Sequence, residues 1–408
     1  MRRISFMDDH AHKDPSTTPA SQISRREFLQ VIGAAAAGSL LTGCGLNNLA
    51  PTGTASTSPV TPATNVAPTG TAPTSPVTPI TYTGPRPLVA IAQANSYDRT
   101  LIRQQVQEMF DKLGGVEDIV GPGDKIAIKV NLTGGVGALP QNGEPATEYH
   151  ILHPEVVRAV GELLRDAGAK ELYIVEAVSD AQSFPQWGFT DVAKSLDATL
   201  VDLNQSLPYP DFATVPVGAG YYLYENFILN RLLEEVDAFV SVAKFKSHCT
   251  AGVTFSMKNL VGIAPVRYYR QSPQDGYRTA FHGTAEGKNT RIPRIIVDLN
   301  RARPIHLAVI DGVSTCEGGE GPWNINTKQV KPGVLLAGKN ALATDAVATS
   351  VMGFDPTSEG PEEPFLQSDN HLNLAYQMGL GTNRLDEIDT VGVKPEGVRI
   401  PFAPCREW

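Results

Sequence analysis

Short apolar runs alternate with amphipathic stretches through most of residues 86–408, and this alternation limits the possible folds more than any other feature of the chain. Runs such as LVAIA, KIAIKV and ELYIV have the length of buried strands. Stretches with helical spacing separate them, and Pro154 and Gly168 mark the beginning and the end of the clearest helix. We predict an α/β fold in which helices cover both faces of a mainly parallel sheet.

The same pattern places the remaining elements. We expect further strands at 200–203, 238–246, 306–310 and 334–337, and further helices at 228–236, 292–301 and 341–352. In a sheet of this kind, ligands bind beyond the carboxyl ends of the strands. Polar residues at those ends are therefore the first candidates for a functional site.

Residues 1–43 have the features of an export signal rather than of a folded domain. The segment SRREFLQ at 24–30 resembles the twin-arginine export motif through Arg25 and Arg26, and a short apolar stretch follows it. The stretch ends in LTGC, which resembles the lipobox of bacterial lipoproteins. That resemblance implies diacylation of Cys44. We therefore predict export by the twin-arginine machinery and a lipid anchor on the extracytoplasmic side of a bacterial membrane.

Residues 44–85 are predicted to form a disordered linker between this anchor and the globular domain. From 45 to 85 no side chain is charged, and 26 of the 41 residues are Pro, Thr, Ser or Gly. The segment at 51–62 recurs at 68–79 with one change. Such a composition cannot bury enough apolar surface to fold. The globular α/β domain is then expected at 86–408.

Charge and cysteine content exclude two broad classes of protein. The net charge of −9 argues against a nucleic-acid-binding protein, and four cysteines in 408 residues exclude a disulfide-stapled scaffold. No C-x-x-C pair occurs, which argues against an iron–sulfur cluster. The sequence leaves open whether Cys249 and Cys316 are reactive thiols, metal ligands, disulfide partners or buried apolar residues.

Lysine, asparagine, histidine and acidic residues gather at the expected strand ends. Lys244, Lys246 and His248 alternate along VAKFKSH, so they share one face if the segment is extended. We predict that the strand-end residues form a single pocket. The expected catalytic residues are His248, Lys246, Asp311 and Glu176. The expected ligand-binding residues are Lys129, Asn131, Lys244, Lys258 and Asn259.

The sequence does not identify a cofactor. A divalent metal is one alternative, because carboxylates follow the strand at 306–310 and recur in the helix at 341–352. Its expected ligands are Asp311, Glu317, Glu320 and Asp345.

Taken together, these motifs resemble domain-of-unknown-function family 362. The resemblance is carried by KVNL at 129–132, KFKSH at 244–248, KNLVG at 258–262, Asp311-Gly312 with its glycine-rich loop, Asp345, and Met352-Gly353. It covers most of 86–395 and implies that the family's recurrent polar residues correspond to these positions. It implies no reaction, because the family has no established general chemistry. Many members carry ferredoxin-like cysteine clusters, and this chain departs from them there.

The expected function is therefore that of an exported, membrane-tethered protein with a pocket for a small anionic ligand or substrate. In an enzyme, the lysines would hold a carboxylate or phosphate and His248 would carry a proton, with or without a metal or redox cofactor. A lipoprotein that binds an anion without turnover is the alternative. A purely structural envelope protein is disfavoured, because clustered lysines without a ligand cost stability.

Overall fold

A twisted sheet of eight strands runs through the computed structural model, which describes residues 82–283 and 288–407. The strand order is β14-β1-β13-β10-β7-β2-β3-β4. Only β13 among these eight runs antiparallel to its neighbours, and the remaining adjacent pairs are parallel. The strands are β1 Leu88–Gln93, β2 Lys125–Lys129, β3 Glu171–Glu176, β4 Thr199–Asp202, β7 Ala238–Lys244, β10 Leu307–Gly312, β13 Val334–Gly338 and β14 Asp389–Gly392.

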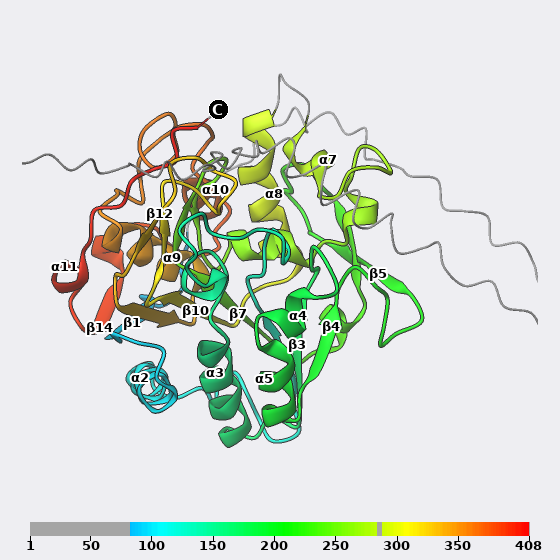
Figure 1. Ribbon diagram of the computed structural model, residues 1–408, viewed down its shortest axis with the longest axis horizontal. Coiled ribbons are helices and arrows are strands. Elements are labelled where there is room, and N and C mark those ends of the chain that lie inside the picture. Colours follow the sequence, from blue (N-terminus) through cyan, green and yellow to red (C-terminus); the bar gives the residue numbers. More distant parts are fainter. Residues whose placement is uncertain (1–81, 284–287, 408) are drawn as a thin grey trace, which may run out of the picture.

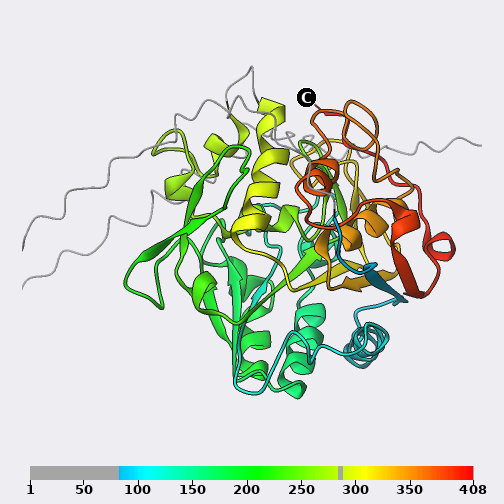
Figure 2. The same ribbon diagram turned by 180° about the vertical axis from the view of Figure 1, so that it is seen from behind.

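Helices cover both faces of this sheet, as Figure 1 shows. One face carries α2 (Arg99–Lys112), α3 (Pro154–Asp166) and α5 (Phe189–Leu196), and the other carries α8 (Lys288–Ala302), α9 (Ala341–Val351) and α10 (His371–Gln377). The view from behind in Figure 2 shows the same two layers. The predicted α/β fold with a mainly parallel sheet is confirmed.

Each layer buries its own apolar core, because successive side chains of a strand point to opposite faces. In β2, Ile126 and Ile128 pack into the core beneath α2, α3 and α5, whereas Ala127 packs into the opposite core. Pro154 begins α3, and the His153 side chain caps it by accepting a hydrogen bond from the Glu155 amide.

Smaller elements surround the sheet, and several of them build the site described below. The two-stranded sheets pair β5 (Phe212–Pro216) with β6 (Asn226–Asn230), β8 (Lys246–His248) with β9 (Gly252–Thr254), and β11 (Thr315–Glu317) with β12 (Lys328–Val330). The short helices are α4 Ser183–Gln186, α6 Leu232–Glu235, α7 Thr279–His282, α11 Pro395–Val398, and the 3₁₀ turns η2 Ala146–Glu148, η3 Lys258–Ile263, η4 Val266–Tyr268 and η5 Leu385–Glu387.

Most predicted elements occur where the sequence indicates, but the helix expected at 228–236 is wrong. Its first part belongs to β6, in which Phe227 and Leu229 are buried and alternate with the exposed Asn226 and Ile228. This period of two belongs to a strand, and only the short α6 follows it.

The strand ends meet as the parallel topology requires. Lys129 pairs with Val175 and Ser241 across β2, β3 and β7, and Asp311 pairs with Lys244 across β10 and β7. The carboxyl ends of β2, β3, β7 and β10 therefore share one edge of the sheet. The predicted export signal and most of the predicted linker, including Cys44, Arg25 and Arg26, lie outside the described residues. Within 82–283 and 288–407, no helix combines the length and apolar character that a membrane crossing needs.

Candidate functional site

A polar pocket lies at the shared edge, and we call it the site pocket. Its lining brings together eight residues that the sequence predicts for a site, and among the lining residues that it does not predict are Thr254 and Arg278. The eight predicted residues are Lys129, Asn131, Glu176, Lys246, His248, Lys258, Asn259 and Glu320. They come from β2, β3, β8, η3 and the loop after β11, so elements far apart in the sequence build one cavity.

A buried ion pair forms one wall of the site pocket. The Lys129 Nζ lies 2.9 Å from Glu176 Oε1, with both side chains less than 5% exposed. The same Nζ also donates to the Val130 carbonyl at 2.7 Å and to Asn259 Oδ1 at 3.0 Å. Burial lowers the pKa of Lys129 and raises that of Glu176, and the mutual attraction opposes both shifts. The three donor positions of this ammonium are therefore used inside the protein.

Two asparagines extend this wall and leave one acceptor open. Asn259 Oδ1 accepts hydrogen bonds from Lys129 and from Asn131 Nδ2, each at 3.0 Å. Asn259 Nδ2 donates to the carbonyls of Lys129 and Val242. These contacts fix the orientation of both amides. Asn131 Oδ1 is then a buried acceptor with no hydrogen-bond partner among the described residues.

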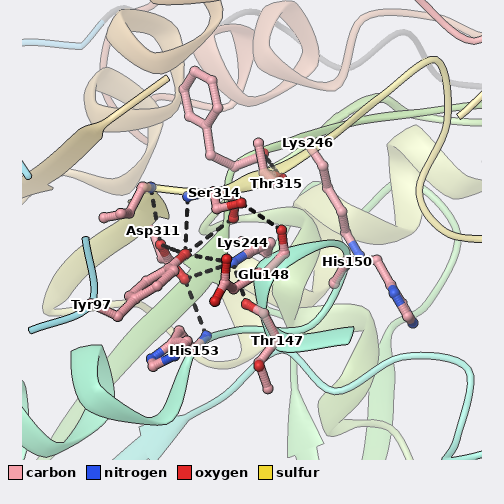
Figure 3. Close-up of polar contacts among 12 residues, drawn as sticks. Tyr97, Thr147, Glu148, His150, His153, Lys244, Lys246, Asp311, Ser314 and Thr315 are labelled. Carbon is pink, nitrogen blue, oxygen red and sulfur yellow. Dashed lines mark hydrogen bonds and ion pairs between the residues drawn. The ribbon is translucent and has the colours of Figure 1, made fainter. Parts of the chain in front are cut away.

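The Lys246 ammonium is also hydrogen-bonded by groups of the protein itself. Its Nζ donates to the backbone carbonyls of His150 at 2.8 Å and Glu320 at 2.9 Å, and Figure 3 shows the side chain directed toward His150. Burial lowers the pKa of Lys246 to about 8. The side chain joins the loop before α3 to the loop after β11, so its role is at least partly structural.

Glu320 and His248 lie side by side opposite the ion pair. Glu320 Oε2 accepts from the Cys249 amide at 3.0 Å, and Oε1 accepts from Trp323 Nε1 at 3.1 Å. His248 Nδ1 accepts from the Thr250 amide at 3.1 Å and lies 3.9 Å from Glu320 Oε2. The amide contact suits a neutral ring with its proton on Nε2, whereas an ion pair with Glu320 requires a proton on Nδ1. The two contacts therefore depend on which ring nitrogen of His248 carries the proton.

Lys258 and Arg278 are the cations of the site pocket that keep most of their donors unused. The Lys258 ammonium makes no hydrogen bond or ion pair within the described part of the chain, and burial lowers its pKa to about 8. Arg278 donates from Nε to the Ala264 carbonyl, but its Nη2 is buried without a partner. Thr254 Oγ1 is buried and unpartnered as well. Buried polar atoms are normally paired, so these atoms point to a missing ligand or water.

Lys244 and Asp311 correct the expectation of a single pocket. They form a second, fully buried ion pair, in which Nζ lies 2.9 Å from Asp311 Oδ2. Lys244 also donates to the Tyr97 hydroxyl and the Thr147 carbonyl, each at 3.0 Å, and the Tyr97 hydroxyl donates to Asp311 Oδ1 at 2.8 Å (Figure 3). Neither side chain lines the site pocket. The pair supports the edge of the sheet beside the pocket.

A break after β7 explains why the two lysines separate. The strand expected at 238–246 ends at Lys244, and Lys246 begins β8, which pairs with β9 instead of with the main sheet. Between them, the Phe245 amide donates to the Asp311 carbonyl, and the Phe245 ring packs against Phe255. The alternation of a single continuous strand is therefore lost, and the two ammonium groups reach different partners.

The carboxylates expected to bind a metal do not meet. Asp345 accepts from the amides of Ser256 and Met257, just before η3, and burial raises its pKa to about 7. Glu317 accepts from the Ala403 amide, while Asp311 and Glu320 have the partners given above. Nowhere in 82–283 and 288–407 do three His, Cys, Asp or Glu side chains form a group suited to a metal ion.

The structure also resolves the alternatives for the cysteines. Cys249, next to His248, forms a disulfide with Cys405. Cys316 is a buried free thiol, and burial raises its pKa to about 12, so it is not ionised near neutral pH. The disulfide partner of Cys249 lies 156 residues away, and no spacing motif in the sequence indicates it.

Sequence reasoning missed Arg278, Thr254 and Tyr97. Arg278 lies in a segment without regular strand or helix spacing, between η4 and α7. Thr254 pairs with Lys246 across the β8–β9 hairpin. The glycine at 252 is the sequence feature that could have predicted this hairpin.

Replacing Gly262 with alanine is expected to disturb the site from within. A Cβ at this position would lie 2.3 Å from Glu176 Oε1 and 2.7 Å from Lys129 Nζ, so the buried ion pair must shift. We expect a loss of about 1–3 kcal/mol in unfolding free energy, measured by urea denaturation. Gly137→Ala is the matched control, because no atom lies within 4 Å of its added Cβ. Equal stabilities of the two variants would contradict the packing argument.

Three comparisons show which known proteins this chain is similar to. A family model described as "Domain of unknown function (DUF362)" matches residues 126–350, more than half of the chain. A thylakoid-associated protein of Synechocystis sp. is 25% identical over 278 residues, which is 66% of this chain and 76% of that protein. A crystal structure of a protein from Thermotoga maritima aligns with a TM-score of 0.32 at 14% identity, covering 71% of this chain and 60% of that one.

Proposed function

We propose that this chain, which belongs to the DUF362 family, binds a small organic anion in the site pocket and works from a lipid anchor outside the cytoplasm. One observation carries the binding proposal. Asn131 Oδ1, Thr254 Oγ1 and Arg278 Nη2 are buried atoms without partners, and all three residues line the same cavity. The Lys258 ammonium joins them there.

The charge of the site pocket supports an anion. Its lining holds four cationic side chains, Lys129, Lys246, Lys258 and Arg278, against the two acidic side chains Glu176 and Glu320. The Lys129–Glu176 pair is internally compensated, so the uncompensated positive charge belongs to the other cations. Arginine and lysine donors bind carboxylate and phosphate through charge-assisted hydrogen bonds. Asn131 Oδ1 adds an acceptor, which suits an anion that also carries a hydroxyl or another donor.

Acid–base chemistry on the bound anion is the enzymatic form of this proposal. His248 and Lys258 line the same pocket, and a lysine with a pKa of about 8 exchanges protons near neutral pH. In this form His248 and Lys258 would move the proton, and Arg278 and Thr254 would hold the substrate. Binding without turnover is the second candidate, because the predicted catalytic residues Lys246 and Asp311 are engaged in internal contacts. Any turnover of a bound anion that Lys258→Met abolishes favours the enzyme.

Two observations support a location outside the cytoplasm. The Cys249–Cys405 disulfide suits an oxidising compartment, because cytosolic thiols are kept reduced. The Synechocystis relative is named for its association with a membrane system. With the twin-arginine-like segment at 24–30 and the lipobox-like Cys44, they favour an exported lipoprotein carried on the linker at 44–85.

Replacing Lys258 with methionine is expected to weaken sulfate binding about 10- to 150-fold, because one charge-assisted contact of roughly 1.5–3 kcal/mol is lost. Stability should be unchanged or slightly higher, since this ammonium has no partner within the described residues and its charged form is disfavoured by burial. Isothermal titration calorimetry measures the affinity. Affinity of the unaltered protein should fall as the pH rises through about 8, because the ammonium groups of Lys258 and Lys246 lose their protons there. Sulfate keeps its charge over this range.

Lys328→Met is the matched control for that experiment. Lys328 is an exposed lysine on β12 and does not line the site pocket, so its loss removes the same charge without touching the site. The binding proposal is wrong if both variants bind sulfate equally, or if the unaltered protein binds no anion at all.

Replacing Cys44 with alanine is expected to release the protein from the membrane without changing the stability of the globular domain. The reason is that Cys44 is the cysteine that follows the lipobox-like segment. Membrane fractionation and labelling with radioactive palmitate in a bacterial host measure the effect. Cys316→Ala, a change in the buried core, should leave labelling intact. Palmitate incorporation into the Cys44→Ala protein would refute the anchor.

A further inference from the structure

We infer that the ligand of the site pocket is an acid carried on a flat, apolar ring, with the ring lying in a second pocket beside Trp323. This inference rests on the proposed function and narrows it to a substrate class. We call the second cavity the outer pocket. Its lining includes Val178, Val266, Tyr277, His282, Ile292 and Trp323, together with two glycines and the residues that it shares with the site pocket.

The two pockets are continuous. His248, Lys258, Arg278 and Glu320 line both of them. Lys258 and Arg278, which keep most of their donors unused, therefore lie at the junction. An acidic group held by them lies where the two cavities meet, and the rest of the ligand extends into one cavity or the other.

The chemistry of the two linings differs, and this difference sets the direction of the ligand. Residues that line only the site pocket are mostly polar, such as Lys129, Asn131 and Glu176. Residues that line only the outer pocket are mostly apolar or aromatic, such as Val178 and Tyr277. Apolar surface gains free energy on leaving water only against an apolar wall. A ligand held at the junction therefore places its hydrogen-bonding groups inward and its apolar body outward.

Trp323 is held firmly at this wall. Its Nε1 donates to Glu320 Oε1 at 3.1 Å, which ties the indole to a residue of the junction. The far edge of the indole lies close to two glycines from different loops, because a Cβ added at Gly134 or at Gly321 would lie 2.5 Å from a ring atom of Trp323. Gly134 also has a φ of +94°, which suits glycine. Two glycine-rich segments of the sequence thus fix one aromatic ring at the mouth of a cationic site.

A fixed indole beside an apolar cavity favours a planar ring over a flexible chain. Aromatic pairs gain attraction beyond the area that they bury, and a preset side chain loses little entropy on binding. The acidic group can be a carboxylate or a phosphate, since lysine and arginine bind both. We therefore expect an aryl acid to bind at least about tenfold more tightly than the corresponding methyl acid.

The test compares matched pairs of anions by isothermal titration calorimetry. Acetate is paired with benzoate, and methyl phosphate with phenyl phosphate, so that each pair differs in the ring and the two pairs differ in the acid. We expect the aryl member of at least one pair to bind about tenfold more tightly or better. The pair that shows the effect identifies the acid. Cyclohexanecarboxylate, which is apolar but not flat, should bind more weakly than benzoate.

Two variants assign the preference to Trp323. In Trp323→Ala the preference for the aryl anion should disappear while the affinity for the methyl anion stays within about threefold. Trp323→Phe should keep most of the preference, and this second variant covers the case in which the alanine variant is poorly folded. Trp187→Phe, at a buried position outside both pockets, should change neither affinity.

The outcomes separate this inference from the proposed function. Equal affinities within both pairs would overturn the aryl inference and leave the anion site standing. A preference for the ring that survives in Trp323→Ala would overturn the assignment to the outer pocket. Failure of every anion to bind would refute both proposals.

Discussion

Replacing Lys244 with methionine is expected to lower the unfolding free energy by about 3–5 kcal/mol, because the Asp311 carboxylate would remain buried without its counter-ion. Both side chains are 0% exposed, so water cannot replace the lost ammonium. The Thr147 carbonyl and the Tyr97 hydroxyl would each lose a donor as well. Denaturation with urea, followed by circular dichroism, measures the loss.

Lys339→Met is the control for Lys244→Met. Lys339 pairs with Asp118 at the surface, where the two side chains are 27% and 63% exposed. Such a pair contributes between about 0 and 1 kcal/mol, because water and salt screen the charges. If both substitutions cost the same, the Lys244–Asp311 contact is not the buried ion pair described above.

Reducing the Cys249–Cys405 disulfide is expected to have the second large effect, a loss of roughly 5 kcal/mol. The bridge closes a loop between residues 156 apart in the sequence, and the entropy of the unfolded chain rises when it opens. Thermal unfolding with and without a reductant measures the effect. The variant Cys405→Ala should unfold at the temperature of the reduced protein and should not respond to the reductant. A response in that variant, or none in the unaltered protein, would contradict the prediction.

The fold follows from local patterns, which is why most of it could be predicted. Strands such as β3 are short and apolar, and α3 has a helical stripe with a proline at its start. Both signals arise within about a dozen residues. The wrongly predicted segment, β6, is a short strand that pairs with β5, so its period of two was too brief to separate from a helical pattern.

The sequence indicates which residues form the site better than it indicates which atoms those residues contact. Strand ends on one edge of a parallel sheet must be neighbours, so Lys129 and Glu176 meet as expected. Two of the contacts of Lys244 and Lys246 could not be predicted, because their acceptors are the backbone carbonyls of residues 147 and 150, about a hundred positions away. A backbone carbonyl acceptor cannot be identified from residue type, since every residue carries a backbone carbonyl. Arg278 was missed because no regular element positions it.

The break between β7 and β8 has a consequence for how such a chain can vary among organisms. A single residue separates Lys244 from Lys246, yet their ammonium groups belong to two separate sets of contacts. The residue between them packs its ring into the core and sends its amide to Asp311. Another bulky apolar residue could replace Phe245. An insertion or deletion, in contrast, would move the two lysines away from their present hydrogen-bond partners. In this segment we therefore expect a change in the number of residues to be tolerated less well than a change in the identity of residue 245.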